Sequence, residues 1–151
     1  VSDRAFRGEY EDRGGPAVLS FLSEQLALFE NGNSESIRFH SKIVSDDTNQ
    51  LTEAIKSLSS DKNCCLIVTT GGTGISERDI TPQTTEALCK DWILHGFGER
   101  MRTASWDAGV KTAPISRATA GVYDRKTLIV NVPGSPKAVD CCLSAVLVSI
   151  T

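Results

Sequence analysis

Residues 64–88 combine a glycine-rich turn with charged side chains, a pattern that suits phosphate chemistry. The stretch reads CCLIVTTGGTGISERDITPQTTEAL, in which an apolar run ends in the block GGTG and Arg78 and Asp79 follow. Glycine lets backbone N–H groups come close to an anion. The block matches neither the Walker A nor the dinucleotide pattern, so by itself it could serve only the geometry of a turn. The glycines that we assign to phosphate contact are Gly71, Gly72 and Gly74.

Two aspartates near the ends of predicted strands could hold a metal ion. Asp47 and Gln50 fit a capping box, which leaves Asp46 without a structural task, and a cap at Thr81 likewise leaves Asp79 spare. Phosphate beside a bare carboxylate would be repelled by about 4 kcal/mol per close pair at an effective dielectric near 20. We therefore expect Asp46 and Asp79 to hold Mg²⁺ against the phosphates of a nucleotide. The alternative for either residue is a solvated surface carboxylate.

Basic side chains would neutralise the remaining phosphate charge, and metal-assisted phosphoryl or nucleotidyl transfer is the reaction class that this layout favours. The cations that we assign to this task are Arg78, Arg117 and Lys137.

Composition limits the classes of partner. The 151 residues fit one domain, 1–151, and 16 basic against 19 acidic residues argue against nucleic acid or an anionic membrane as the main partner. No apolar run approaches the roughly 20 residues of a membrane span. The five cysteines form no C-x-x-C pair, which disfavours zinc. We expect buried, reduced thiols, as suits a cytosolic protein.

Apolar periodicity predicts alternating helices and strands along the chain. The predicted helices cover residues 16–29, 48–60, 82–94 and 98–106, and a last one begins near Pro136. The predicted strands cover residues 36–44, 64–70 and two segments within 113–132 that a turn at 123–126 joins. This order indicates an α/β fold with helices on both faces of a mostly parallel sheet. A strand before Val1 would complete it, and we expect residues 1–151 to lack that strand.

The loops after the predicted strands place proline at the start of three helices, in the pairs Gly15-Pro16, Thr81-Pro82 and Ser135-Pro136. Proline suits the first helical position, and a preceding Thr or Ser can cap the helix. We therefore expect several positive helix ends to face one rim of the sheet, where a polyanion would bind. In such sheets, ligands bind beyond the carboxyl ends of the strands.

Five stretches, in order, resemble the MogA/MoaB-like family of molybdenum-cofactor biosynthesis proteins, which includes the G domains of gephyrin and its plant counterpart. The stretches are VSDRAFRGEYEDRGGP, VSDD, TTGGTGISERDITPQTTEAL, GFGERMR and ISRATAGVYDRKTLIVNVPGSPKAV. The resemblance spans nearly the whole chain. The pattern G-G-T-G-x-x-x-R-D-x-T-P together with N-x-P-G-S-P-K is highly specific.

The resemblance implies a molybdopterin adenylyltransferase, a cytoplasmic nucleotidyltransferase that uses Mg²⁺ and ATP to place AMP on the terminal phosphate of molybdopterin and releases pyrophosphate. It also implies a three-layer α/β/α sandwich, a homotrimer, and a molybdenum insertase (MoeA-like) that receives the product. The family's two aspartates correspond to Asp46 and Asp79, its glycine-block threonine to Thr73, and the serine of its L-S-R-x-x-x-G element to Ser116. The turn that would hold pterin or phosphate falls on Pro133, Gly134, Ser135 and Pro136.

Several positions depart from the family pattern. Gly14 stands where serine is common, and Ser45 stands where proline is usual. Glu77 adds a negative charge, so its side chain should point away from the phosphate site. Ser116 taken alone reads as a capping or ladder-bonding serine. Two other functions stay open: a pterin-binding protein without adenylylation, and a trimeric scaffold module.

Overall fold

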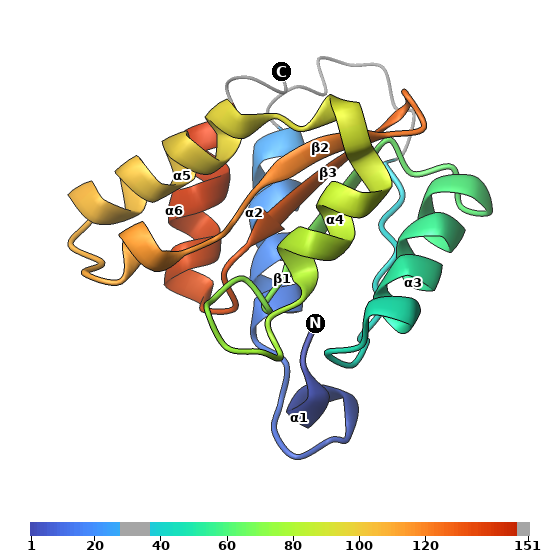
Figure 1. Cartoon of the computed structure of the whole chain (residues 1–151), viewed down its shortest axis with the longest axis horizontal. Helices are drawn as coiled ribbons and strands as arrows, with labels where there is room; N and C mark the ends of the chain where they lie inside the picture. Colours follow the sequence, from blue (N-terminus) through green and yellow to red (C-terminus); the bar gives the residue numbers. More distant parts are fainter. Residues whose placement is uncertain (28–36, 148–151) are drawn as a thin grey trace.

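A three-stranded sheet runs through the middle of the computed structural model, which describes residues 1–27 and 37–147 (Figure 1). The strands are β1 (Leu66–Thr70), β2 (Ala120–Tyr123) and β3 (Thr127–Val132). The central strand β3 pairs parallel with β1 and antiparallel with β2. The predicted turn between β2 and β3 is confirmed, since Asp124 and Arg125 have positive φ angles of 49° and 55° and the N–H of Lys126 donates to the carbonyl of Tyr123.

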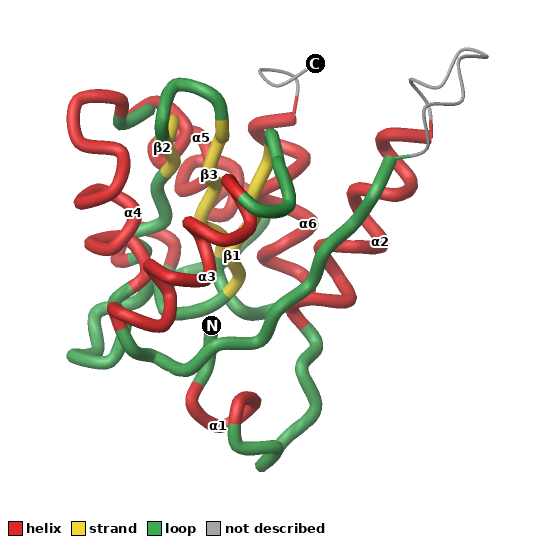
Figure 2. Tube along the Cα trace, turned by 90° about the vertical axis from the view of Figure 1, so that its right-hand side faces the viewer, coloured by secondary structure: helices red, strands yellow, loops and turns green. Residues whose placement is uncertain are grey.

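Helices cover both faces of the sheet, as Figure 2 shows from the side. The helices on one face are α2 (Gly14–Ala27), α5 (His95–Asp107) and α6 (Pro136–Leu147), and those on the other are α3 (Thr48–Ser60) and α4 (Thr81–Cys89). The short elements are α1 (Asp3–Phe6), η1 (Lys90–Trp92) and η2 (Ala113–Ile115). The predicted α/β class with a helical layer on each face is therefore confirmed, but in the described residues the sheet is mixed rather than mostly parallel, because β2 pairs antiparallel with β3. No helix in 1–27 or 37–147 is long and apolar enough to cross a membrane.

Two apolar clusters hold the layers together because side chains alternate across a strand. Ile67 of β1 and its partner Ile129 of β3 pack with Leu51 and Ile55 of α3. The neighbouring Val130 faces the other way, into the cluster formed by α2, α5 and α6. The parallel register, in which Thr70 lies opposite Val132, places the carboxyl ends of β1 and β3 side by side.

The predicted strand at 36–44 is wrong over its described part. Residues 37–43 are not part of the sheet, and Ile37, Phe39 and Ile43 are 42–44% exposed. The alternating pattern needs a hydrogen-bonded neighbour to become a strand. Instead, the Ser2 N–H donates to the Val44 carbonyl, and the Val1 nitrogen donates to the Thr70 carbonyl at the end of β1. The strand expected before Val1 stays a prediction.

The helix boundaries differ from the predicted ones where a local contact overrides the periodic pattern. Helix α2 begins at Gly14, ahead of Pro16, because the Asp12 carboxylate accepts the N–H groups of Gly14 and Gly15. Helix α4 ends at Cys89 because Lys90 adopts a φ of 47°. The predicted position of Phe29 lies outside the described residues.

The cysteine prediction is confirmed for some residues and wrong for others. All five cysteines are free thiols. Cys89 and Cys142 are buried, and burial raises the pKa of the Cys89 thiol to about 11. Cys65 is exposed and Cys64 is partly buried, because they precede β1 and lie outside the covered strand.

Candidate active site

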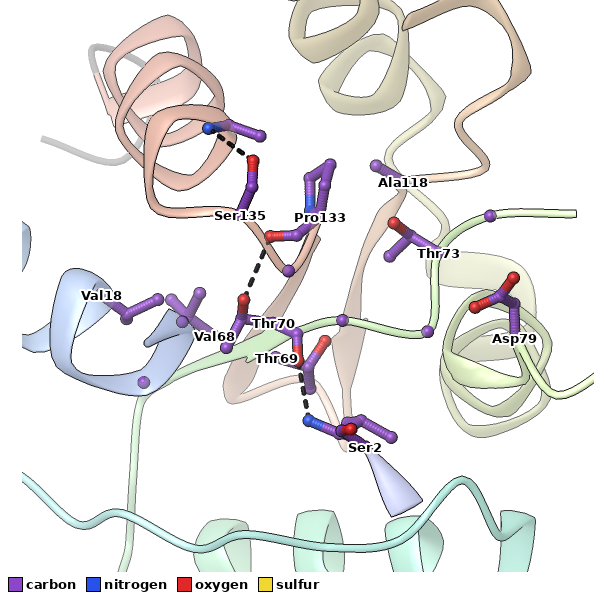
Figure 3. A pocket seen from close by; sticks show the side chains of 18 of the residues that line it. Ser2, Val18, Val68, Thr69, Thr70, Thr73, Asp79, Ala118, Pro133 and Ser135 are labelled. Carbon is purple, nitrogen blue, oxygen red and sulfur yellow. Dashed lines mark hydrogen bonds between the residues drawn. The ribbon is translucent and has the colours of Figure 1, made fainter. Parts of the chain in front are cut away.

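A cavity of about 640 Å³ opens at the carboxyl ends of β1 and β3 (Figure 3). Eleven of the thirteen predicted site residues line it: Asp46, Gly71, Gly72, Thr73, Gly74, Arg78, Asp79, Ser116, Pro133, Gly134 and Ser135. Arg117 and Lys137 do not line it. The position agrees with the rule that ligands of α/β sheets bind beyond the carboxyl ends of parallel strands.

The glycine loop after β1 and the turn after β3 lie side by side at the cavity floor. The Thr70 hydroxyl donates to the Pro133 carbonyl at 3.1 Å, and a Cβ at Gly134 would lie 3.5 Å from the Cα of Gly71. Gly14 packs against the same place, where a Cβ would lie 2.6 Å from Thr70 Oγ1. A side chain at position 14 would therefore require the Thr70 side chain to move.

In the glycine loop, which lines the cavity, the carbonyls are hydrogen-bonded and the N–H groups of three described residues are not. Gly71 and Gly72 have φ angles of 95° and 65°, and their carbonyls accept the hydroxyl and the N–H of Thr81. In residues 1–27 and 37–147, the N–H groups of Gly72, Thr73 and Gly74 donate to no protein acceptor. Successive free N–H groups of this kind can form a nest that binds an anion. The Thr73 hydroxyl, also without a protein partner in these residues, adds a further donor.

Thr81 stabilises this loop instead of capping α4, so the predicted cap at Thr81 is wrong. Helix α4 begins at Thr81 itself, and Ile80 precedes it without a side-chain cap. The Thr81 side chain is completely buried, and its hydroxyl donates to the Gly71 carbonyl at 3.0 Å. A hydroxyl in this position satisfies a carbonyl of the turn, whereas capping would turn it toward its own helix.

We expect Thr81→Val to lower the free energy of unfolding by about 1–3 kcal/mol, because the Gly71 carbonyl would lose its donor. Urea denaturation of both proteins measures this difference. Thr84→Val is the matched control. Its buried hydroxyl donates to the Ile80 carbonyl, which also accepts the Thr84 N–H, so its loss leaves no carbonyl unpaired. Equal effects of the two substitutions would contradict the role of Thr81.

Asp46 has a structural partner, so the prediction that it is spare is wrong. Its Oδ2 accepts the Asp3 N–H at 3.0 Å, and its own N–H donates to Asp3 Oδ1 at 2.9 Å. This reciprocal pair joins α1 to the segment before α3. The predicted cap by the neighbouring Asp47 is confirmed, since its Oδ1 accepts the Gln50 N–H at 2.8 Å.

Asp79 also has a structural contact, because its Oδ2 accepts the Ser76 N–H at 2.8 Å and closes the loop that follows the glycines. A Cβ at Gly74 would lie 2.8 Å from the same oxygen, so Asp79 packs directly against the glycine loop, as Figure 3 shows. The Oδ1 atoms of Asp79 and Asp46 have no protein donor in the described ranges. Each carboxylate thus keeps one free oxygen.

These free oxygens decide whether the site suits a divalent cation. No group of three or more His, Cys, Asp or Glu side chains in 1–27 and 37–147 could hold a metal ion. Mg²⁺ commonly takes one or two carboxylates and completes its shell with water and substrate phosphates. Two cavity-lining aspartates, each with an unbonded oxygen, supply ligands of the kind and number that Mg²⁺ takes from proteins.

The cations around the cavity are only partly those predicted. Arg78 lines it, but Arg117 and Lys137 do not, and Glu77 is exposed and stays outside, as expected. Three further cations line the cavity: Arg4, Lys42 and Arg102. Arg4 of α1 and Arg102 stand within stretches that resemble the family, but neither was singled out from the sequence, and Lys42 lies outside those stretches.

Hydroxyl groups near the strand ends mostly serve the backbone. Ser116 Oγ accepts the Ala118 N–H at 3.3 Å, so the simple reading of this serine as a backbone-bonding residue is confirmed. Ser135 Oγ accepts the Ala138 N–H at 3.3 Å, which confirms the predicted cap of α6. Both hydroxyls keep a proton to donate toward the cavity that they line.

The chain is similar in sequence and in fold to known molybdopterin proteins. The family described as "Probable molybdopterin binding domain" matches residues 1–150. A Helicobacter pylori protein named molybdopterin adenylyltransferase is 42% identical over 150 residues, which cover 99% of this chain and 80% of that protein. An Escherichia coli K12 protein of the same name is 36% identical, with 97% and 70% covered. The solved structure of a molybdopterin biosynthesis protein from Mycobacterium abscessus has a TM-score of 0.83 at 30% identity and covers 98% of this chain and 85% of its own.

Proposed function

The chain belongs to the molybdopterin-binding family, and on this premise we propose that it is a molybdopterin adenylyltransferase of molybdenum cofactor biosynthesis. It would transfer AMP from ATP to the terminal phosphate of molybdopterin and release pyrophosphate. The names of relatives that are 36–42% identical over nearly the whole chain support this proposal.

The observation that carries the proposal is the donor surface of the glycine loop. Three consecutive N–H groups without protein acceptors, in Gly72, Thr73 and Gly74, lie beside the carboxylate of Asp79. Donors alone would suit any anion, and carboxylates alone would repel one. Their combination suits a nucleotide whose phosphate charge is shared between backbone N–H groups and a cation.

The reaction is a displacement at the α-phosphorus of ATP. An oxygen of the terminal phosphate of molybdopterin would form the new bond to this phosphorus. The bond from the α-phosphorus to the oxygen that it shares with the β-phosphorus would break, and this oxygen would leave as part of pyrophosphate. Most of the catalysis in phosphoryl transfer comes from positioning and from stabilising charge. The glycine loop and Thr73 would hold the phosphates, and Arg78, which lines the cavity, would neutralise the leaving pyrophosphate.

Asp46 and Asp79 would hold Mg²⁺ through their unbonded Oδ1 atoms. When bound, Mg²⁺ would supply positive charge that offsets the phosphate charge and would ease the departure of pyrophosphate. The turn at Pro133, Gly134 and Ser135, next to the glycine loop, would hold the pterin side together with Ser116. Lys137 is exposed beside this turn and would contribute only at longer range.

Family membership also supports the finer parts of the proposal. We propose that the protein works in the cytoplasm as a homotrimer and passes adenylylated molybdopterin to a molybdenum insertase. These statements rest on the family and on no contact within the chain.

The proposed activity has a direct test. Purified protein incubated with molybdopterin and Mg-ATP should form adenylylated molybdopterin and pyrophosphate in equal amounts, measured by chromatography and a pyrophosphate assay. EDTA should stop both products. Tight binding of molybdopterin with no product would support the pterin-binding alternative and contradict the proposed transferase.

A further inference from the structure

We propose that Arg117 is a positioning residue that shapes the anion site from behind, rather than a side chain that contacts phosphate. This inference rests on the proposed function of the same site. Arg117 makes three hydrogen bonds to the glycine loop and its continuation. Its backbone N–H donates to the Thr73 carbonyl at 2.8 Å, its Nε donates to the Gly74 carbonyl at 2.7 Å, and its Nη2 donates to the Asp79 carbonyl.

The position of Arg117 sets it apart from a phosphate ligand. It is partly buried and does not line the cavity, and its guanidinium is directed at two loop carbonyls. Arg117 also has no carboxylate partner, since the ion pair between Arg7 and Glu9 is the only one in residues 1–27 and 37–147. The guanidinium of Arg117 therefore interacts with backbone carbonyls and with no carboxylate of the described residues.

With Arg117 included, every carbonyl of the glycine loop has a donor. Thr81 supplies the donors to Gly71 and Gly72, and Arg117 supplies those to Thr73 and Gly74. In a planar trans peptide, the carbonyl and the following N–H point in opposite directions. Holding these four successive carbonyls on their donors therefore fixes the following N–H groups on the opposite side of each peptide, as a run of donors for one anion requires.

The guanidinium controls two particular peptides. Its bond to Gly74 orients the N–H of Ile75, which donates to no protein acceptor in the described ranges, and its bond to the Asp79 carbonyl fixes the backbone that bears the proposed metal ligand. Without these bonds, the Gly74 peptide could rotate and present its carbonyl to the phosphate. Because glycine resists such rotation least, this is the point where an external clamp matters most.

A second arginine, Arg102, holds the segment around Arg117 in place. Arg102 of α5 donates through Nη1 to the carbonyls of Ser116 and Ala118, on either side of Arg117. The segment that carries Arg117 is therefore tied to a helix on one side and to the glycine loop on the other.

Lysine cannot replace arginine in this role. A planar guanidinium presents several N–H groups in a fixed fork and can bond two carbonyls at once, whereas an ammonium is a point charge. A residue that merely attracts phosphate by charge should tolerate Lys. This difference separates the two roles of Arg117 by experiment.

The variants Arg117→Lys and Arg117→Gln are compared with Arg78→Lys and Arg78→Gln, with inorganic pyrophosphate as the probe in calorimetric titrations. We expect both Arg117 variants to weaken pyrophosphate binding by about 10- to 100-fold, because the bonds lost involve a charged donor. For Arg78, which lines the cavity, Lys should bind within a few-fold of the wild type and Gln should bind more weakly. Wild-type affinity in Arg117→Lys with loss only in Arg117→Gln would overturn the positioning role.

A measurement on the unsubstituted protein keeps the inference testable if the variants do not fold. In an isotope-labelled sample, pyrophosphate should shift the NMR signals of the backbone N–H groups from 72 to 75, while the Arg117 Nε–H signal moves little. A dominant shift at Arg117 Nε–H, or no shift in the loop, would refute the proposal. Pyrophosphate binding at the loop without formation of adenylylated molybdopterin would instead count against the proposed function and leave the clamp intact.

Discussion

Asp79→Asn is expected to lower the rate of adenylylation by about 100-fold or more, since a lost carboxylate ligand removes several kcal/mol of charge stabilisation. Asparagine keeps a side-chain carbonyl oxygen that can still accept the Ser76 N–H now bound at 2.8 Å by Oδ2. The loop should therefore keep its shape while the negative charge disappears. The measurement is kcat and KM with molybdopterin and Mg-ATP, together with the magnesium concentration that gives half-maximal rate, which should rise.

Asp47→Asn is the matched control for this experiment. Asp47 is exposed, lies next to Asp46 and caps α3, but it does not line the cavity. The same change of charge at this site should leave kcat within a few-fold of the wild type, because asparagine is also a good cap. A normal rate in Asp79→Asn, at an unchanged magnesium requirement, would remove Asp79 from the proposed metal site.

The sequence predicted well those parts of the fold that depend on regular patterns. The apolar run at 64–70 and the hairpin near 123–126 have short-range signals, and the structure shows β1 and the paired β2 and β3 there. The segment 37–43 alternates just as regularly but is not part of the sheet. Alternation shows that a segment could form a strand, whereas pairing depends on which backbone comes alongside it.

The roles of single polar residues were predicted least well, because they depend on contacts between distant parts of the chain. The Asp47 cap involves residues three apart and was predicted correctly. The partner of Asp46 is Asp3, 43 residues away, and the partners of Arg117 lie 38 and 43 residues away. A local rule recognises an arginine near a phosphate loop but cannot tell whether it faces the phosphate or the backbone behind it.

The same limit applies to Thr81, and it explains why the glycine loop was recognised while its support was not. Glycines announce an unusual backbone in the sequence itself, since positive φ angles favour them. The hydroxyl that holds the Gly71 carbonyl comes from a residue whose sequence context indicates a helix cap. The sequence therefore predicts the parts of the site where the backbone needs glycine. It does not predict which ordinary side chains hold that backbone in place.

Gly72→Ala tests directly whether the shape of this backbone creates the anion site. Gly72 has a φ of 65°, and a Cβ there would collide with Thr81 Oγ1, the buried atom that donates to Gly71. The positive φ should cost about 1–2 kcal/mol, and displacement of the Thr81 hydroxyl about 1–3 kcal/mol more. We expect a matching loss in the free energy of unfolding. We also expect pyrophosphate to bind at least about tenfold more weakly, which corresponds to a loss of about 1.4 kcal/mol in binding free energy.

Gly109→Ala separates backbone strain from the collision. Gly109 has a φ of 84°, but no atom lies within 4 Å of the position that its Cβ would take, and it does not line the cavity. Alanine there should bring only the cost of the positive φ and leave pyrophosphate binding unchanged. Unaltered pyrophosphate affinity in Gly72→Ala would mean that the loop N–H groups are not the phosphate ligands. If instead the affinity falls only at Gly72, the collision with Thr81 has disturbed the peptide orientations on which binding depends.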